Sequence, residues 1–419
     1  MRMRNGSSSA GASGHGEPSD PITQTVTAPL LLALIASVLI LQFCIGIGIA
    51  ILRKRRASAP VVVPDVEAVS LRTWTGWRKF RVVRREFEDP DRTQCSFYLE
   101  PVDRSPLSSF RPGQYLTFRL GPLTRCYSLS DSPDPTSYRI TVKRVPAPFD
   151  RPSLPPGACS GHLLDRVKVG DVLEMKAPSG RFFLDPDPTT PAVLIGGGVG
   201  ITPMMSMLRW CLSETPQRIV HLYYGVRNSG EHAFKQQLEQ LARTHRTLQL
   251  NVVYSRPGPN DALGRDFRQT GHVDITLLQR TLPEGRYQFY VCGPAKMMES
   301  LLPALVDWGV AKDNIHHEAF GPASAPKKDV PSLRAPVEIH FRLSGRTLLW
   351  DGQDETLLEF AERHAVPVDA GCRSGGCGCC ETKLVSGTVR YVRDPDHELT
   401  PGSCLLCLAT PASALTLEA

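Results

Sequence analysis

The sequence predicts a multidomain protein with four structured parts: one transmembrane helix, an antiparallel β-barrel, a doubly wound α/β domain with a parallel sheet, and a small α+β domain. Three observations predict this organisation. Residues 28–52 carry no charge. Short β-rich segments fill residues 71–186 and give way to alternating strands and helices over residues 187–322. Residues 336–419 hold strand-like segments around a cysteine-rich loop.

The uncharged segment, residues 28–52, is long enough to cross the hydrocarbon core of a bilayer, about 30 Å thick, as a helix. A basic cluster follows at once in residues 53–56, whereas the preceding segment holds two arginines and two acidic residues. The positive-inside rule therefore predicts a single-pass protein of the cell membrane, with its N-terminus outside and its later domains in the cytoplasm. The alternative is a cleaved signal peptide, which the long apolar run and the basic flank disfavour.

The segments between these parts are predicted to be tails and linkers. Residues 1–27 begin with a stretch rich in glycine and serine and are predicted to be disordered; residues 53–70 form a juxtamembrane linker, and residues 323–335 a second, proline-containing linker. The twelve cysteines lack the spacing of a disulfide framework, which indicates a reducing compartment. The net charge of +6 is dispersed apart from one basic cluster and gives no support to a nucleic-acid partner.

In the predicted barrel, the strand "RCYSLS" (residues 125–130) has chemical interest. Arg125 can make bidentate hydrogen bonds to a phosphate. Tyr127 lies on the same strand face and offers a flat ring, and Ser128 can donate a hydrogen bond. From Gly157 to Ser160 the chain is predicted to open a short helix, with Ser160 as its N-cap and backbone N–H groups free to hold a pyrophosphate. On the residues alone, an ordinary structural strand remains the alternative for residues 125–130.

The next domain opens with "PAVLIGGGVGITPMMSMLRW", which predicts a buried strand, a glycine turn and a helix. Glycines let the backbone approach a diphosphate, and the N-terminus of a helix favours negative charge. The pattern is not G-x-G-x-x-G, so alone it is a moderate signal. Further strands alternate with helices, which predicts a parallel sheet with ligands at the carboxyl ends of its strands, where Cys292 and Gly293 fall.

Five motifs follow one another in residues 74–322: Arg-x-Tyr-Ser, G-x-x-S-x-x-L, GGGVGITP, CGP and E-x-F-G-P. Their order and spacing resemble the ferredoxin–NADP reductase superfamily and are similar to the reductase half of flavohaemoglobins. The resemblance implies that Tyr127 stacks on a flavin ring, that Ser128 contacts its N5 edge and that Arg125 binds its phosphates. "APSGRFF" is similar to the branch that uses FAD rather than FMN.

The resemblance also implies the remaining site residues. The expected flavin-binding set is Arg125, Tyr127, Ser128, Val142, Lys143, Gly157, Cys159, Ser160 and Phe320. The expected nicotinamide-binding set is Gly198, Gly200, Ile201, Thr202, Cys292 and Gly293. The expected catalytic residues are Ser128, Cys292 and Glu318. The choice between NADH and NADPH stays open. Arg227, or Ser255 with Arg256, could pair with the 2′-phosphate of NADPH. The segment "YGVRN", however, also resembles the corresponding segment of enzymes that use NADH.

The stretch "GCRSGGCGCC" (residues 371–380) contains the spacing Cys372-x4-Cys377-x2-Cys380, which with a distant fourth cysteine matches a 2Fe–2S ligand pattern. Its glycines let backbone amides point at the sulfides, and Arg373 adds positive charge. Zinc is the alternative, because "CLLC" (residues 404–407) would supply a second CxxC pair.

Residues 337–419 resemble plant-type ferredoxins, whose loop reads C-R-x-G-x-C-G-x-C. The resemblance implies a β-grasp fold and assigns Cys372, Cys377, Cys380 and Cys407 as the cluster ligands. Cys404 is the competitor for the fourth position, and Cys379 is a bystander.

Together these resemblances imply an NAD(P)H-dependent reductase that moves electrons through FAD to a 2Fe–2S cluster. A flavin exchanges electrons both in pairs and singly, so it connects a hydride donor to a one-electron carrier. The expected acceptor is a separate protein, such as an oxygenase, hydroxylase or desaturase, at or in the membrane. The alternatives are a redox-sensing membrane module, and a reductase of quinone or ferric ion.

Overall fold

The computed structural model describes residue 42 and residues 74–419, apart from residues 75, 122, 148–152, 154, 321–335, 353–355, 396 and 398. The predicted tail, both predicted linkers and all but one residue of the predicted transmembrane segment lie outside the described residues. Among the described residues, none of the helices combines the length and the hydropathy that crossing a membrane requires. Leu71–Ala419 form a single unit by their contacts.

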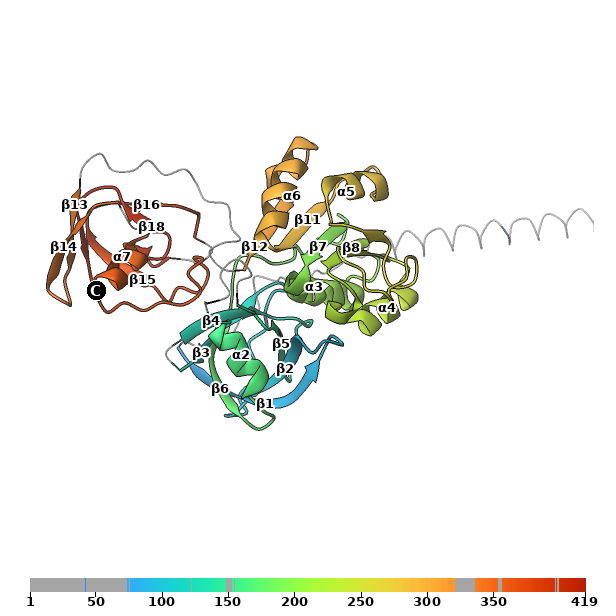
Figure 1. Cartoon of the computed structure of the whole chain (residues 1–419), viewed down its shortest axis with the longest axis horizontal. Helices are drawn as coiled ribbons and strands as arrows, with labels where there is room; N and C mark the ends of the chain where they lie inside the picture. The colour runs from blue at the N-terminus through green and yellow to red at the C-terminus, as the bar shows by residue number, and fades with distance from the viewer. Residues whose placement is uncertain are drawn as a thin grey trace, which may run out of the picture. The chain divides into compact units, whose positions relative to one another are not determined.

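Six strands form an antiparallel sheet in the order β4-β3-β6-β1-β2-β5 (Figure 1). A bridge between Leu129 and Ile140 joins the end of β4 to β5, so the two edges of the sheet meet as in a barrel. Phe80, Phe97 and Phe118 fill its interior and are fully buried. The antiparallel sheet predicted from the β-rich segments is thus confirmed. The elements are β1 (Arg78–Phe87), β2 (Gln94–Pro101), β3 (Tyr115–Leu120), β4 (Leu123–Ser128), β5 (Tyr138–Lys143), α2 (Ala158–Asp165) and β6 (Val172–Ser179).

The next six strands form a parallel sheet in the order β10-β9-β8-β7-β11-β12. Alternate residues of its strands face two hydrophobic cores, one shared with α3 and α4 and the other with α5 and α6, so helices cover both faces. The elements are β7 (Ala192–Gly197), η1 (Gly198–Gly200), α3 (Ile201–Glu214), β8 (Val220–Val226), η2 (Ser229–Glu231), α4 (Lys235–Thr244), β9 (Leu248–Tyr254), β10 (Gln269–Thr270), α5 (Ile275–Thr281), β11 (Gln288–Gly293), α6 (Ala295–Asp307), η3 (Lys312–Asn314) and β12 (Ile315–Ala319).

The strand order reverses between β7 and β11, whose carboxyl ends lie side by side with Cys292 opposite Gly196. Gly200 follows β7 here and packs against the backbone of β11. A Cβ atom at Gly200 would lie 2.5 Å from the carbonyl carbon of Cys292, so only glycine fits. Doubly wound sheets open a crevice for ligands at the point where the strand order reverses. The sequence predicted a ligand site at this turn.

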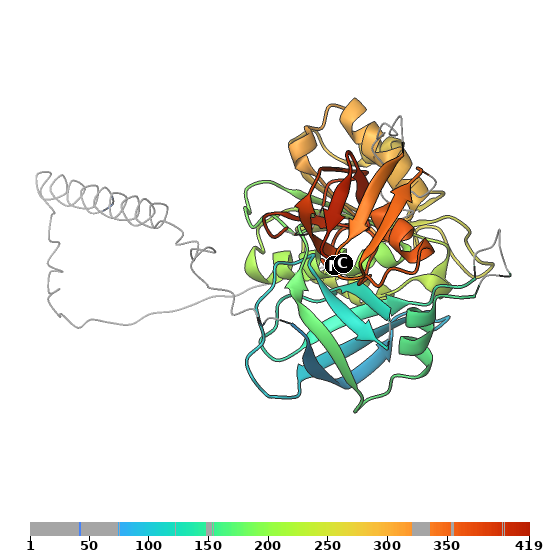
Figure 2. The ribbon, with the colours of Figure 1, turned by 90° about the vertical axis from the view of Figure 1, so that its left-hand side faces the viewer.

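The C-terminal domain has a mixed five-stranded sheet in the order β14-β13-β19-β15-β17 and a separate pair, β16 with β18 (Figure 2). Its first and last strands, β13 and β19, are parallel neighbours, whereas the other pairs are antiparallel. Thr356 is the N-cap of helix α7, and its side chain accepts a hydrogen bond from the amide of Glu359. The elements are β13 (Val337–Phe341), β14 (Arg346–Trp350), α7 (Leu357–Arg363), β15 (Glu381–Ser386), β16 (Val389–Tyr391), β17 (Ser403–Leu405), β18 (Ala409–Pro411) and β19 (Leu415–Leu417).

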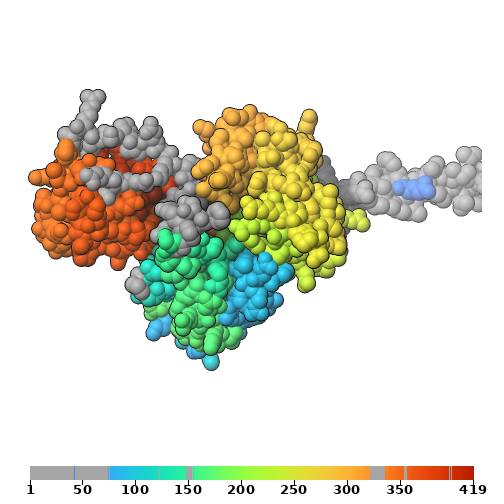
Figure 3. Space-filling view, in the orientation of Figure 1, coloured from blue at the N-terminus to red at the C-terminus, as the bar shows by residue number. Residues whose placement is uncertain are grey.

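This small domain is held together by a core between α7 and the sheet. Leu357, Leu358 and Phe360 of the helix are buried against Ile339 and Phe341 of β13. The hairpin of β13 and β14 also contributes to the orange surface in Figure 3. The strand-like segments predicted around the cysteine-rich loop are confirmed.

Candidate functional site

A cavity of about 500 Å³ lies where all three domains contribute side chains. One wall comes from the barrel, at β4, β5 and the start of α2. A second comes from the α/β domain, at the glycine turn and the end of β12. The third comes from the cysteine loop. The lining residues are Tyr115, Arg125, Cys126, Tyr127, Ser128, Thr141, Lys143, Val145, Gly157, Ala158, Cys159, Ser160, Val199, Thr202, Glu318, Ala319, Phe320, Cys372, Arg373, Ser374 and Gly376.

Two of the predicted catalytic residues meet at this cavity. The hydroxyl of Ser128 donates a hydrogen bond to Oε2 of Glu318, at 3.3 Å, although 190 residues separate them. Glu318 lies on β12 directly opposite Cys292 of β11. Burial, and then the nearby Glu318 carboxylate, raise the pKa of Cys292 well above its usual value, so that thiol stays neutral. Cys292 itself is fully buried and does not line the cavity.

Tyr127, predicted to stack on the flavin, lines the cavity together with Cys126 and Ser128 of the same strand. Its ring meets Phe118 edge to face, with the centroids 5.6 Å apart, which fixes its orientation. Burial raises the pKa of Tyr127 above its usual value, so its hydroxyl is protonated at neutral pH. A neutral, fixed aromatic ring at the cavity wall is what a stacking role requires.

Arg125, predicted to bind flavin phosphates, also lines the cavity, but its partners are backbone carbonyls. Its Nη1 donates to the oxygen of Thr124 at 2.7 Å and to that of Gly371 at 3.3 Å. The second bond reaches from the barrel to the cysteine loop. The guanidinium therefore stands at the junction of the barrel and the C-terminal domain.

The start of α2 corrects one sequence prediction. The N-cap of α2 is Gly157, and Ser160 lies inside the helix. The Ser160 hydroxyl accepts from the amide of Val145 at 3.1 Å and donates to the carbonyl of Gly157 at 3.0 Å, so this side chain ties the helix to the barrel. The predicted N-cap at Ser160 was wrong because this non-local bond outweighs the local preference of serine for a cap. Among the residues that the structure describes, no side chain caps α2. Its first turn lines the cavity, where an anionic group would find free amides.

Of the expected flavin-binding residues, Val142 does not reach the cavity, because its side chain is buried in the barrel core. Its neighbour Lys143 lines the cavity, and its Nζ pairs with Oε2 of Glu231 at 2.6 Å. Arg227, a candidate for a 2′-phosphate, pairs with Oε1 of the same carboxylate at 2.8 Å. The two cationic side chains thus share one acidic partner.

The expected nicotinamide-binding residues lie at the carboxyl ends of β7 and β11, next to the cavity. Thr202 lines it, and its hydroxyl donates to the carbonyl of Val199 at 2.9 Å, which braces the turn. The other five residues of the expected set are not among the lining residues of the cavity. They are Gly198, Gly200, Ile201, Cys292 and Gly293. Gly200 and the carbonyl of Cys292 form the close backbone contact described above.

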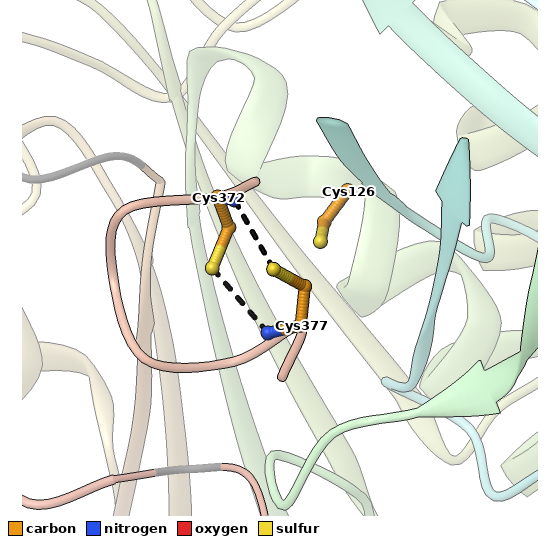
Figure 4. Close-up of side chains that lie close together, drawn as sticks. All are labelled: Cys126, Cys372 and Cys377. Carbon is orange, nitrogen blue, oxygen red and sulfur yellow. Dashed lines mark hydrogen bonds between the residues drawn. The ribbon is translucent and has the colours of Figure 1, made fainter. Parts of the chain in front are cut away.

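The four predicted metal ligands fall into two pairs. In the first, the amide of Cys372 donates to Sγ of Cys377 at 3.2 Å, and the amide of Cys377 donates to Sγ of Cys372 at 3.3 Å (Figure 4). The amide of Gly376 also donates to Sγ of Cys372, at 3.3 Å. In the second, Cys380 and Cys407 are both buried in the core of the C-terminal domain, and the amide of Leu406, the neighbour of Cys407, donates to the carbonyl of Cys380 at 3.2 Å. Amides directed at sulfur favour thiolates, and a 2Fe–2S cluster takes four cysteine thiolates. This donor set fits such a cluster.

The other polar and sulfur-bearing residues of the C-terminal domain have different partners. The Arg373 guanidinium pairs with Glu362 of α7, with Nη1 2.8 Å from Oε2. Cys404, the competitor for the fourth ligand position, is fully buried in the hydrophobic core. Cys379 lies 3.9 Å from Nζ of Lys176, on β6 of the barrel.

The sequence did not reveal that the cysteine loop forms a wall of the flavin cavity. The hydroxyl of Tyr115 on β3 donates to the carbonyl of Gly376, and a Cβ atom at Gly376 would lie 2.7 Å from that hydroxyl oxygen. Cys126 on β4 was also missed. Its Sγ and those of Cys372 and Cys377 all lie within 4.8 Å of one another (Figure 4). Cys126 is the unspecified residue of Arg-x-Tyr-Ser, so the motif carried no signal for it.

Comparisons with known proteins agree with this geometry. Residues 194–302 match the family described as oxidoreductase NAD-binding domain, and residues 341–412 match the 2Fe–2S iron–sulfur cluster binding domain. The flavohemoprotein of Rhizobium meliloti (strain 1021) is 40% identical over 255 residues, which are 59% of this chain and 62% of the relative. The chain thus spans less than two thirds of the length of that relative.

Two solved structures are similar. The FAD/NAD binding domain of nitric oxide dioxygenase from Vibrio cholerae O1 biovar El Tor is 33% identical, with a TM-score of 0.52, and the match covers 58% of this chain and 99% of that one. Phthalate dioxygenase reductase is 24% identical, with a TM-score of 0.53, and the match covers 82% of this chain and 98% of that one. The second likeness extends the shared fold into the C-terminal domain.

Proposed function

We propose that this chain, an oxidoreductase of the ferredoxin-reductase type with an NAD-binding domain and a 2Fe–2S domain, delivers electrons from NAD(P)H singly to a separate protein acceptor. Its cofactors are NAD(P)H, FAD and the 2Fe–2S cluster. The observation that carries the proposal is the cavity shared by the flavin motif and the cysteine loop. The proposed cluster ligands are Cys372, Cys377, Cys380 and Cys407.

The bound flavin supplies the exchange between electron pairs and single electrons. The residues of the chain bind and orient the cofactors and shield them from water. Tyr127 presents a fixed ring to a planar group, and Ser128 is held by Glu318 with its hydroxyl at the cavity wall. The first amides of α2 provide a place for a diphosphate. The loop from Cys372 to Gly376 covers one side of the cavity and limits the access of water.

The proposed acceptor is an oxygenase, hydroxylase or desaturase. Support comes from the shared fold with phthalate dioxygenase reductase, a protein described as a modular structure for electron transfer from pyridine nucleotides to a 2Fe–2S centre. The proposed location is the cell membrane, with residues 28–52 as the anchor and the N-terminus outside; its support is the uncharged segment and the basic cluster after it. Fractionation would test it: the full chain should stay with membranes after a carbonate wash, and a chain that starts at residue 71 should not.

An anaerobic reduction experiment tests the proposed function. NADH or NADPH should bleach the flavin absorbance of the purified protein and then produce the electron paramagnetic resonance signal of a reduced 2Fe–2S cluster. Rapid reduction of cytochrome c should accompany it. A redox sensor without turnover would reduce neither cytochrome c nor ferricyanide. A quinone or ferric-ion reductase would reduce quinones or ferric ions much faster than cytochrome c.

Replacing Tyr127 by alanine is expected to weaken flavin retention. The ring lines the cavity, and the loss of a stacked aromatic costs about 1–3 kcal/mol for each stacked ring in comparable sites. The purified Tyr127→Ala protein should therefore carry substoichiometric FAD, which is recovered by adding free FAD, whereas Tyr127→Phe should stay loaded. Full FAD occupancy in the alanine variant after gel filtration would refute the stacking role.

A further inference from the structure

Cys126 is a third sulfur beside the first pair of cluster cysteines, and it comes from a different domain. It lies on β4, between Arg125 and Tyr127 of the flavin motif, whereas Cys372 and Cys377 belong to the C-terminal loop. The three Sγ atoms lie within 4.8 Å of one another.

The position of Cys126 is held by a partner on the neighbouring strand. Cys126 pairs with Thr117 across β3 and β4, and Oγ1 of Thr117 lies 3.5 Å from Sγ of Cys126. Thr117 is almost fully buried. Since a hydroxyl is a stronger donor than a thiol, Thr117 donates to Cys126 and leaves the thiol proton of Cys126 for another acceptor.

The loop is clamped against the same strands by two further bonds. Tyr115, on β3, donates to the carbonyl of Gly376, and Arg125, on β4, donates to the carbonyl of Gly371 at 3.3 Å. These bonds flank the three sulfurs. The approach of Cys126 to the loop is therefore part of an interface between the barrel and the C-terminal domain.

The direction of the sulfur contact follows from the chemistry of the cluster. Cysteines that bind iron do so as thiolates and carry no proton, so Cys372 and Cys377 can only accept. Among the three sulfurs, the proton must come from Cys126. A hydrogen bond to a ligand sulfur draws electron density from the cluster and raises its reduction potential, because the reduced form carries the greater negative charge.

We propose that Cys126 is a positioning residue of the electron path: its thiol donates a hydrogen bond from the flavin strand to the ligand sulfurs of Cys372 and Cys377 and thereby raises the reduction potential of the cluster. The proposal rests on the proposed function, since it needs the cluster at these cysteines. Strand β4 then has two roles, because the strand that carries the flavin motif also sets the reduction potential of the cluster.

The test is a redox titration of the intact protein, in which the cluster is followed by electron paramagnetic resonance and the flavin by absorbance. Cys126→Ala should lower the midpoint potential of the cluster and leave its iron content unchanged. Cys126→Ser keeps a donor and should hold the midpoint close to that of the unaltered protein. Thr117→Val removes only the partner of Cys126, so it should lower the midpoint by a smaller amount.

The outcomes separate this inference from the proposed function. An unaltered protein without a cluster signal would overturn both. A normal cluster signal with the same midpoint in Cys126→Ala as in the unaltered protein would overturn the hydrogen-bond role alone. Loss of iron from Cys126→Ala but not from Thr117→Val would also overturn it, since Cys126 would then be a ligand.

Discussion

Replacing Cys380 by serine is expected to abolish reduction of cytochrome c and to leave the reduction of ferricyanide by NAD(P)H largely intact. Cys380 and Cys407 are the second pair of predicted ligands and are both buried. Serine offers a hard oxygen in place of a soft thiolate, so the cluster would be lost or labile. Changes beyond the first ligands of a metal site already cost about 10–100-fold in activity, so loss of a ligand should cost at least that much. Ferricyanide takes electrons directly from the flavin and does not need the cluster.

The matched control is Cys379→Ser, the adjacent cysteine of the same loop. The Cys379 thiol contacts Lys176 and the carbonyl of Cys377 rather than the second pair. This variant should keep its iron and most of its cytochrome c activity. Equal loss of cytochrome c reduction in both variants would contradict the ligand assignment. Loss of ferricyanide reduction in Cys380→Ser would mean that the loop is needed to keep the flavin in its cavity.

Replacing Gly200 by alanine is expected to remove productive binding of NAD(P)H. The new methyl group would overlap the carbonyl of Cys292, which belongs to the backbone and cannot turn aside as a flexible side chain could. The turn after β7 would have to move away from the end of β11, which would disturb both halves of the expected nicotinamide site. A displacement of about 1 Å at a reacting centre costs about 100-fold, so reduction of the flavin by NAD(P)H should fall by at least this factor.

Gly258→Ala is the control for this substitution in the same domain. A Cβ atom there would find its nearest neighbour at 3.6 Å, which is an ordinary contact, so the variant should behave like the unaltered protein. Reduction of the flavin by dithionite measures whether Gly200→Ala still holds FAD. If Gly200→Ala is reduced by NAD(P)H at the normal rate, the close approach of the two strand ends does not matter for binding.

Local patterns predicted the secondary-structure elements well. The β-rich segments predicted in residues 71–186 correspond to strands β1 to β6, and the GGGVGITP turn joins β7 to α3 as predicted. The spacing of Cys372 and Cys377 predicted two sulfurs that the structure joins through backbone amides. These predictions succeed because the information lies within a few residues of chain.

Contacts between domains could not be predicted in this way. Tyr115 and Gly376 are 261 residues apart, and neither belongs to a motif that refers to the other. Cys126 occupies a position that the flavin motif leaves open. Ser160 shows the opposite case: its local preference predicted a cap, and a bond from the amide of Val145 across the fold placed it inside the helix instead. All but one residue of the predicted membrane anchor lie outside the described residues, so the anchor stays a prediction.

The bond from Tyr115 to the carbonyl of Gly376 means that the C-terminal domain is not freely interchangeable. A hybrid that joined this reductase to a foreign ferredoxin-like domain would need a glycine where Gly376 stands, because any larger residue would strike the Tyr115 hydroxyl. It would also need a loop that accepts from Arg125. Recombination at residues 323–335 separates strands β3 and β4 from the cysteine loop, so it should succeed only when the incoming loop keeps this glycine and a carbonyl that accepts from Arg125.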